Sequence, residues 1–207
     1  MATILRTLSY KYQWFYDGIS NLAALAVGGE NRFRNLALEQ LPIDKNTEVL
    51  DLCCGAGQTT KILAQYSDRV TGLDASPVAL TRAQRNVPNA RYIEGLAQNM
   101  PLESERFDLV HSSVALHEMN PDELQQIFQE VYRVLKPGGV FAFIDFHKPT
   151  NGLFWPPLAL FMWLFETQTA WQLLQTDLLA KLEETGFKIA RHKLYVGGSL
   201  QVAQAKK

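Results

Sequence analysis

The amino-acid sequence predicts a single α/β domain built on a mostly parallel sheet of seven strands. Short runs rich in Val, Ile, Leu and Phe alternate with segments of helical periodicity through the middle of the chain. Such alternation is typical of βαβ units that share one parallel sheet. A length of 207 residues suits one domain, and no repeat or low-complexity stretch marks an internal boundary.

Two helices are expected before the first strand, within an N-terminal part of residues 1–45. Aromatic and aliphatic residues recur with helical spacing over 8–27 and again over 31–41. We expect these helices to cap the open end of the sheet.

The core, residues 46–146, should alternate five strands with three helices. The strand candidates are the apolar runs at 47–53, 69–74, 90–95, 107–113 and 139–146. Helices are predicted at Thr59–Gln65, at Ser76–Asn86 with Pro77 in its first turn, and at Pro121–Leu135, closed by the sequence KPGG.

An apolar insertion, residues 147–170, should follow the last core strand. Its central run GLFWPPLALFMWLF, residues 152–165, is too short to span a bilayer. We interpret it as a lid over an apolar acceptor pocket or as a contact with a membrane surface. The alternative is ordinary core packing.

The C-terminal part, residues 171–207, should complete the sheet. A helix is predicted near Thr169–Glu184, ended by Gly186. The segments 187–196 and 199–206 then read as an antiparallel pair of strands.

Charge and cysteine content narrow the class of protein. Twenty Lys and Arg face twenty-one Asp and Glu, so nothing in the balance favours a nucleic acid as partner. The only cysteines, Cys53 and Cys54, are adjacent and cannot supply a disulfide framework or a spaced set of metal ligands. We expect no metal site, and the absence of a signal-peptide pattern predicts a cytoplasmic protein.

A glycine turn follows the first strand in EVLDLCCGAGQTT. Gly55 and Gly57 let the main chain approach a ligand at the carboxyl end of the strand, where open α/β sheets bind ligands. Asp51 disfavours a phosphate there, and Thr60 stands where a dinucleotide fingerprint needs glycine. Asp74, at the end of the second strand, suits ribose hydroxyls. Together these residues fit S-adenosylmethionine, an adenosyl cofactor without phosphates.

The ordered set VLDLCCGAG, TGLDAS, LAQNMPL, FDLV and LKPGGVFAFID resembles the class I methyltransferases that use S-adenosylmethionine and release S-adenosylhomocysteine. The resemblance covers about half of the chain and implies a Rossmann-like fold. It implies that the glycine turn holds the methionine end, Asp74 the ribose, and residues 96–100 the adenine. The implied cofactor contacts are Tyr16, Asp51, Cys53, Gly55, Ala56, Gly57, Asp74, Ala75, Ala97, Gln98, Asn99 and Ser112.

Two of these positions depart from the family pattern. Many relatives have aspartate where this chain has Leu96, so the adenine amino group needs another acceptor. Many also have glycine at Cys53, which we interpret as a small buried residue rather than a reactive thiol.

Within the class, both ends of the chain resemble the C-methyltransferases of ubiquinone and menaquinone biosynthesis. The cues are YQWFYDGIS, with Tyr16 and Asp17, and the closing YVGGSLQVAQAKK. After the fourth strand, however, those enzymes usually carry an Arg-Asn pair, whereas this chain has His117 and Glu118. We therefore predict a small, lipophilic acceptor, with a quinone precursor as leading candidate, possible peripheral membrane contact and the methylated atom left open.

His117 is the first choice for a catalytic base, because the ordinary pKa of histidine lies near neutrality. Glu118 is the second candidate, with Asp145 and His147 in reserve. The alternatives are a packing role for His117 and a solvated charge for Glu118. Two other classes of function stay open: a protein that binds S-adenosylmethionine without catalysis, and a nucleotide-linked oxidoreductase, which Asp51 and Thr60 disfavour.

Overall fold

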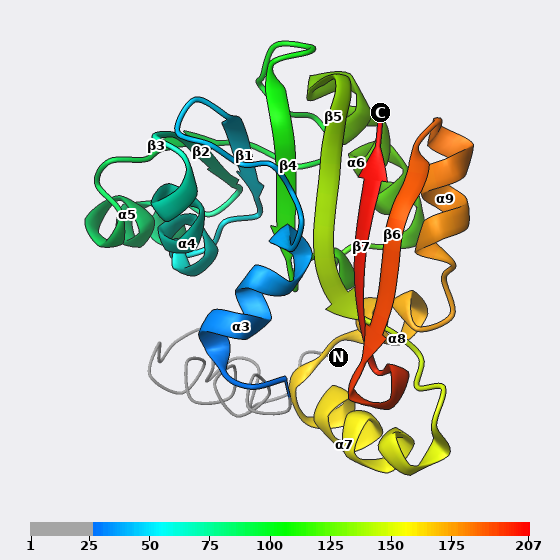
Figure 1. Ribbon diagram of the computed structural model, residues 1–207. Coiled ribbons are helices and arrows are strands. Elements are labelled where there is room, and N and C mark those ends of the chain that lie inside the picture. Colours follow the sequence, from blue (N-terminus) through cyan, green and yellow to red (C-terminus); the bar gives the residue numbers. More distant parts are fainter. Residues whose placement is uncertain (1–26) are drawn as a thin grey trace.

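The computed structural model describes residues 27–207, which form one seven-stranded sheet in the order β3-β2-β1-β4-β5-β7-β6 (Figure 1). The strands are β1 Glu48–Leu52, β2 Arg69–Asp74, β3 Arg91–Glu94, β4 Phe107–Ser113, β5 Leu135–Phe146, β6 Lys188–Tyr195 and β7 Leu200–Lys206. The pairs from β3 across to β5 are parallel, whereas β7 runs antiparallel to both β5 and β6. The predicted fold class is therefore confirmed.

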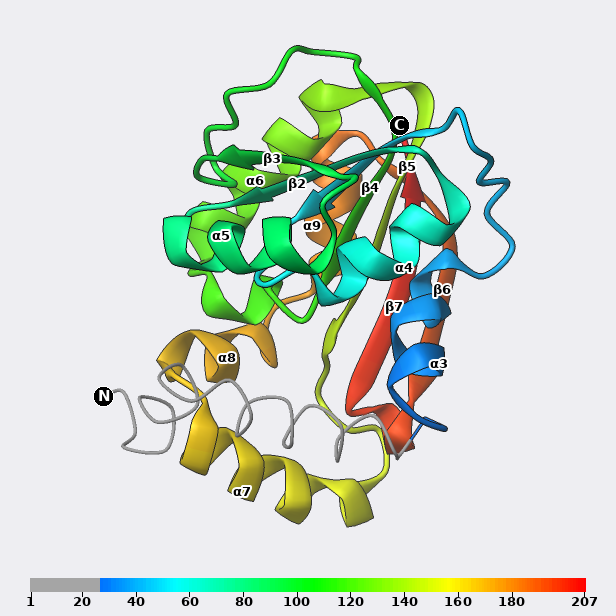
Figure 2. The same cartoon turned by 90° about the vertical axis from the view of Figure 1, so that its left-hand side faces the viewer.

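Helices cover both faces of this sheet, with α3, α4 and α5 on one face and α6 and α9 on the other (Figures 1 and 2). The helices are α3 Glu30–Asn35, α4 Gln58–Tyr66, α5 Pro77–Asn86, α6 Pro121–Val134, α7 Trp155–Phe165, α8 Gln168–Leu173 and α9 Leu178–Thr185. Residues 27–207 also contain four short 3-10 turns: η1 Leu36–Leu38, η2 Leu116–Glu118, η3 Gly152–Phe154 and η4 Val196–Gly198.

The strands form where the sequence is apolar because both faces of the sheet are buried. On one face Phe107, Phe128 and Phe141 belong to a core cluster with residues of α6 and α9. On the other, Val49 and Leu63 belong to a second cluster. Removal of so much apolar surface from water is the main force that holds the sheet together.

The predicted end of the third core helix is wrong by one residue, and the KPGG sequence does not close a helix. α6 ends at Val134 and Leu135 is already extended, with ψ 137°. Leu135 pairs with Phe107, so β5 includes KPGG and is longer than the predicted 139–146. The chain passes directly from the helix into the strand, where Gly138 adopts a φ of +82°.

The single helix predicted at Thr169–Glu184 is also wrong. The structure has two helices there, α8 and α9, separated by four residues. Asp177 caps α9, because its Oδ1 accepts hydrogen bonds from the amides of Leu179 and Ala180 at 3.1 Å. Gly186 ends α9 in a left-handed conformation, as predicted.

The predicted N-terminal helix over 8–27 lies outside the described residues, apart from Val27. The second one, over 31–41, is shorter than predicted: α3 ends at Asn35 and η1 at Leu38. Leu36 and Leu38 belong to the same core cluster as Ile144 of β5 and Val202 of β7.

The apolar insertion is largely helical. Pro156 and Pro157 lie in the first turn of α7, where proline costs no intrahelical hydrogen bond. Within residues 27–207, no helix has the length and apolar character that a membrane span requires.

Candidate functional site

The two glycines of the turn after β1 have different surroundings. Gly57, with φ +86°, caps α4, and a Cβ added there would lie 3.2 Å from the Cα of Ala83. Gly55 has a φ of +55°, and the nearest atom to a Cβ added there would be Gln58 Oε1, at 4.0 Å. Gly57 is therefore required by helix packing, whereas Gly55 leaves open space in front of the main chain.

Asp74 joins the glycine turn to the end of β2. Its Oδ2 accepts a hydrogen bond from the Gly55 amide at 2.8 Å, and its Oδ1 accepts one from the Ser76 amide at 2.9 Å. Since an ionised carboxylate has about four acceptor positions, half of this capacity stays available to ligand hydroxyls.

Asp51 is buried beneath the turn, with a 1 % exposed fraction. Its Oδ2 accepts a hydrogen bond from Thr60 Oγ1 at 2.6 Å, and its Oδ1 lies 3.6 Å from His111 Nδ1. Thr60 thus ties α4 to β1 at the position where a dinucleotide-binding chain would have glycine. Direct contact between Asp51 and the cofactor stays a prediction.

Cys53 is only partly buried, unlike Cys54, but it fits the interpretation of an unreactive small residue. Burial, followed by the charges of Asp74 and Asp51, raises the pKa of its thiol to about 12. The pKa of Cys54 is also raised, mainly by burial. Cys53 has a left-handed φ of +57°, the conformation that favours glycine.

The other predicted cofactor contacts surround this edge of the sheet. Ser112 lies on β4 beside Leu52 of β1, and its buried Oγ has no hydrogen-bond partner among residues 27–207. Ser113 Oγ and both ring nitrogens of His111 are orphaned in the same way, and Ser112 is fully buried, so its contact with the cofactor stays a prediction. The remaining positions are Ala56 in the turn, Ala75 after β2, and Ala97, Gln98 and Asn99 in the loop between β3 and β4; Tyr16 lies outside the described part.

These features fit an adenosyl cofactor without phosphates. The open space at Gly55, the spare acceptor positions of Asp74 and the orphaned Ser112 hydroxyl lie at the carboxyl ends of adjacent strands. None of the three carries the positive charge that would favour a pyrophosphate.

His117 lies in η2, just after β4, in a buried polar cluster. Its Nδ1 is 2.9 Å from Asp145 Oδ1, and its Nε2 is 3.7 Å from Glu118 Oε1 and 3.4 Å from Glu166 Oε2. Burial alone would lower the pKa of this imidazole, but Asp145 and Glu166 outweigh it and raise the pKa to about 10. These two carboxylates therefore favour the positively charged imidazolium over the neutral ring, which disfavours the predicted role of free base.

Asp145 holds the whole loop after β4. It is fully buried and accepts hydrogen bonds from the amides of Ala115 and Leu116 at 3.1 and 2.8 Å. The preceding residue, Val114, has a φ of +52°, an unfavourable conformation for a β-branched side chain. Strain of this kind is typical of functional loops. The reserve candidate Asp145 thus belongs to the His117 cluster.

The other reserve candidate, His147, is not part of this cluster. Its Nδ1 lies 2.8 Å from the carbonyl oxygen of Gly198, and its ring lies near that of His192.

Glu166 was not predicted as a site residue from the sequence. It follows α7 directly and is the first charged residue after the apolar run 152–165. Its position directly after the apolar run was the only sequence signal for a functional role. Its contact with His117 could not be predicted, because the two residues are far apart in the sequence.

An apolar wall formed by Phe146 of β5 and Phe161 of α7 adjoins His117. The ring of Phe146 lies 4.7 Å from the His117 ring, and Phe161 of α7 lies 5.7 Å from Phe146. Leu158 and Met162 bury the inner side of α7 in a small cluster with Ala170 and Leu174.

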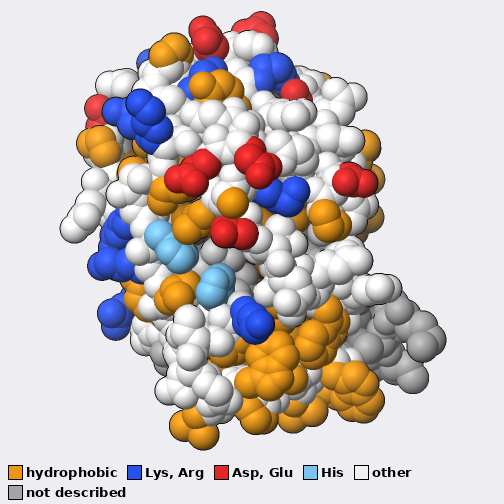
Figure 3. Space-filling model, turned by 90° about the vertical axis from the view of Figure 1, so that its right-hand side faces the viewer, with side chains coloured by type: hydrophobic (Ala, Val, Ile, Leu, Met, Phe, Trp, Pro, Cys, Tyr) orange, Lys and Arg blue, Asp and Glu red, His pale blue; other side chains and the backbone are white. Residues whose placement is uncertain are grey.

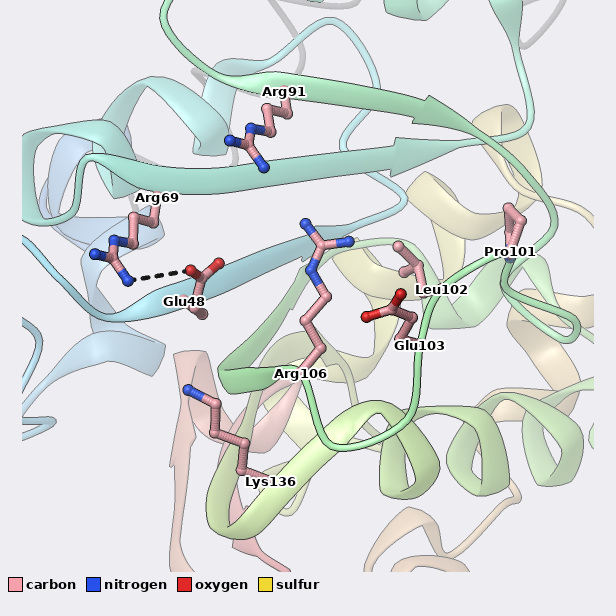
Figure 4. A pocket seen from close by; sticks show the side chains of 8 residues that line it. All are labelled: Glu48, Arg69, Arg91, Pro101, Leu102, Glu103, Arg106 and Lys136. Carbon is pink, nitrogen blue, oxygen red and sulfur yellow. Dashed lines mark hydrogen bonds and ion pairs between the residues drawn. The ribbon is translucent and has the colours of Figure 1, made fainter.

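A cavity of about 630 Å³ opens at the opposite edge of the sheet (Figure 4). Its lining is mostly charged and comes from the amino ends of the strands: Glu48, Arg69, Arg91, Pro101, Leu102, Glu103, Arg106 and Lys136. Glu48 and Arg69 form an ion pair across it at 3.4 Å. Ligands of open α/β sheets bind at the carboxyl ends, so the glycine turn and His117, not this cavity, form the candidate site.

The chain is similar to known methyltransferases. Residues 49–139 match the family model described as a methyltransferase domain. The uncharacterised methyltransferase sll0829 of Synechocystis is 60 % identical over the whole chain and 97 % of its own length. A demethylmenaquinone methyltransferase of Lactiplantibacillus plantarum is 33 % identical over 72 % of this chain and 64 % of its own length. A 2-phytyl-1,4-naphthoquinone methyltransferase of Thermosynechococcus vestitus is 26 % identical over 99 % of this chain and all of its own.

Solved structures show the same fold. A methyltransferase of Mesorhizobium loti that depends on S-adenosylmethionine has a TM-score of 0.64 and 20 % identity, over 88 % of this chain and all of its own. The [4+2]-cyclase SpnF has a TM-score of 0.69 and 18 % identity, over all of this chain and 97 % of its own.

Proposed function

The chain belongs to the S-adenosylmethionine-dependent methyltransferases, and we propose that its methyl acceptor is a small lipophilic molecule, with a quinone precursor as the leading candidate. The observation that carries this proposal is the position of His117, which follows β4, the strand next to β1 and its glycine turn, and contacts Phe146. A polar group for the acceptor's oxygen and an apolar surface for its tail are thus adjacent.

Each end of the site has a proposed role. When bound, S-adenosylmethionine supplies an electrophilic methyl group on a sulfonium. Gly55, Gly57 and Asp51 position the methionine end, and Asp74 accepts hydrogen bonds from the ribose. His117 and Glu118 contact the acceptor. Correct alignment and exclusion of water supply several kcal/mol of the barrier reduction in displacements of this kind.

The leading acceptor class is supported by relatives named for menaquinone and phytyl-naphthoquinone methylation. These are distant, and the His117–Glu118 pair replaces the Arg-Asn pair usual in quinone enzymes. A different small acceptor is therefore the second candidate. It is also favoured by a malonyl-[acyl-carrier protein] O-methyltransferase of Enterobacter lignolyticus, 36 % identical over 55 % of this chain.

A lipophilic acceptor has to reach the site from a membrane or a carrier. Hydrophobic side chains gather at the lower end of the face in Figure 3, the end at which Figure 1 places α7. Leu153, Leu160 and Trp163 are exposed by 78 %, 57 % and 68 %. We propose that this surface touches a membrane peripherally, because exposed Trp and Leu side chains gain free energy when they are buried at the lipid interface.

Methyl transfer to lipid extracts tests the proposal. Purified protein is incubated with methyl-labelled S-adenosylmethionine and total lipid from a strain that lacks the gene. We expect a labelled prenylated quinone with the wild type, and at least ~100-fold less of it with His117→Ala. The control is His147→Ala, which should keep the wild-type rate. A labelled product only in the aqueous fraction would contradict the lipophilic acceptor.

A further inference from the structure

Three side chains that commonly bind metal ions converge at the end of β4. His117, Glu118 and Glu166 each offer one ligand atom, and these atoms all lie within 4.8 Å of one another. They come from η2 and from the residue after α7, so the fold itself brings them together. His117 and Glu166 are nearly buried, with side chains exposed by only 5 % and 11 %.

The other ring nitrogen of His117, Nδ1, binds a carboxylate, as is typical of histidines that ligate a metal ion. Nδ1 lies 2.9 Å from Asp145 Oδ1. Asp145 is fixed in turn by the amides of Ala115, Leu116 and Phe146. A carboxylate on one ring nitrogen orients the other toward a metal and raises its basicity. Here the second nitrogen, Nε2, points at the two glutamates.

The distances from His117 Nε2 to the two glutamates suit a small divalent cation, and no two of the three ligand atoms lie more than 4.8 Å apart. Bonds of 2.0–2.2 Å to a tetrahedral ion separate neighbouring ligand atoms by about 3.4 Å. The distances from His117 Nε2 are 3.4 Å to Glu166 and 3.7 Å to Glu118. Small movements of the two glutamates would therefore complete the geometry.

The local charge also favours a cation. Carboxylate oxygens of Asp145, Glu118 and Glu166 lie 2.9, 3.7 and 3.4 Å from the ring nitrogens of His117 in a partly buried setting. Like charges repel strongly where the dielectric constant is low. A divalent ion would take the place of the Nε2 proton of the imidazolium and add one positive charge to the cluster.

We propose that His117, Glu118 and Glu166 bind a divalent transition metal, with Asp145 as the positioning residue behind His117. One imidazole and two carboxylates suit Zn²⁺, Mn²⁺ or Fe²⁺, whereas Mg²⁺ and Ca²⁺ prefer all-oxygen sites. Three protein ligands leave a coordination position open. If the proposed function holds, that position faces the acceptor, whose oxygen the ion would bind and whose hydroxyl it would acidify. The acceptor class would then be hydroxylated aromatic compounds.

Metal titration of the chelator-treated full chain tests the site, with neither cofactor nor acceptor present. We expect saturable binding of one Mn²⁺ or Zn²⁺ per chain in calorimetry. The visible spectrum of the Co²⁺ form should show the intense bands of a low-coordinate site. Glu166→Gln and Glu118→Gln should each weaken binding at least ~10-fold, and Asp145→Asn by roughly 10- to 100-fold.

Two matched controls separate this site from adventitious binding. Glu184→Gln makes the same change on an exposed residue of α9, and His192→Ala removes a histidine next to His147. Both variants should bind the metal as the wild type does. Absence of saturable binding, or equal loss in Glu166→Gln and Glu184→Gln, would overturn the proposal. The experiment measures only metal binding. A failure to detect methyl transfer would therefore not contradict an observed metal site.

Discussion

Gly55 and Gly57 lie two residues apart in the same turn, yet the structure gives them different roles. Gly55→Ala places a methyl group in open space in front of the turn, whereas Gly57→Ala drives it toward the main chain of α5. We expect Gly55→Ala to lower the free energy of unfolding by about 1 kcal/mol and to weaken S-adenosylhomocysteine binding at least ~10-fold. Gly57→Ala should lower the free energy of unfolding by about 2 kcal/mol or more.

Urea unfolding and calorimetric titration of both variants measure the two effects. Normal ligand affinity in Gly55→Ala would show that the cofactor does not approach this part of the turn.

The two cysteines offer a second test at the residue scale. Burial raises the pKa of Cys53 to about 12 and raises that of Cys54 as well, so few thiolates form in the folded protein. We expect iodoacetamide at mildly alkaline pH to modify Cys53 roughly a thousandfold more slowly in the folded protein than in urea. Peptide mass spectrometry identifies the modified residue. Rapid alkylation of Cys53 without denaturant would mean that its thiol is an accessible nucleophile.

The residues that the sequence could predict are those whose role depends on local pattern. Asp74 and the glycines were found from their distance to strand ends. Glu166 was missed because its relation to His117 exists only after folding. The pKa of His117 was misjudged for the same reason, since the carboxylates of Asp145 and Glu166 come from other elements.

At the scale of elements, α7 has two faces that should have separable functions. Phe161 contacts Phe146 beside His117, whereas Trp163 is 68 % exposed. We expect Phe161→Ala to raise the acceptor KM several-fold with little change in vesicle binding. Trp163→Ser should weaken binding to lipid vesicles and leave the KM for a short-chain acceptor unchanged.

Vesicle sedimentation and steady-state kinetics on both variants check this division. If both substitutions changed only the free energy of unfolding, α7 would serve only to pack the core. That is the alternative that the sequence left open.

Elements were predictable where apolar runs end in clear signals. β2 and β4 match their predicted bounds, and α5 begins after Ser76 with Pro77 in its first turn. The helix near 169–184 was misjudged because its apolar periodicity continues across the break. Only the Asp177 cap, a local hydrogen-bonding feature, divides it. KPGG was misread because Leu135 finds a strand partner in Phe107, a contact distant in sequence.

At the scale of the whole molecule, the sheet order places the functional residues at one edge. β1 lies between β2 and β4, so the glycine turn, Asp74 and Ser112 lie side by side. β5 lies next to β4 and brings Asp145 to His117. A mostly parallel sheet, which the sequence predicts, places the carboxyl ends of these strands together. The contacts of the insertion with His117 could not be predicted from the sequence.

The most direct test of the account is calorimetric titration of S-adenosylhomocysteine into the wild type and two aspartate variants. Asp74 ends β2 and bonds the glycine turn, whereas Asp68 precedes β2 and pairs with Lys45 on the surface. We predict that Asp74→Ala weakens binding at least ~10-fold while Asp68→Ala binds as the wild type does. Equal affinity of all three proteins would contradict the assignment of this edge of the sheet as the cofactor site.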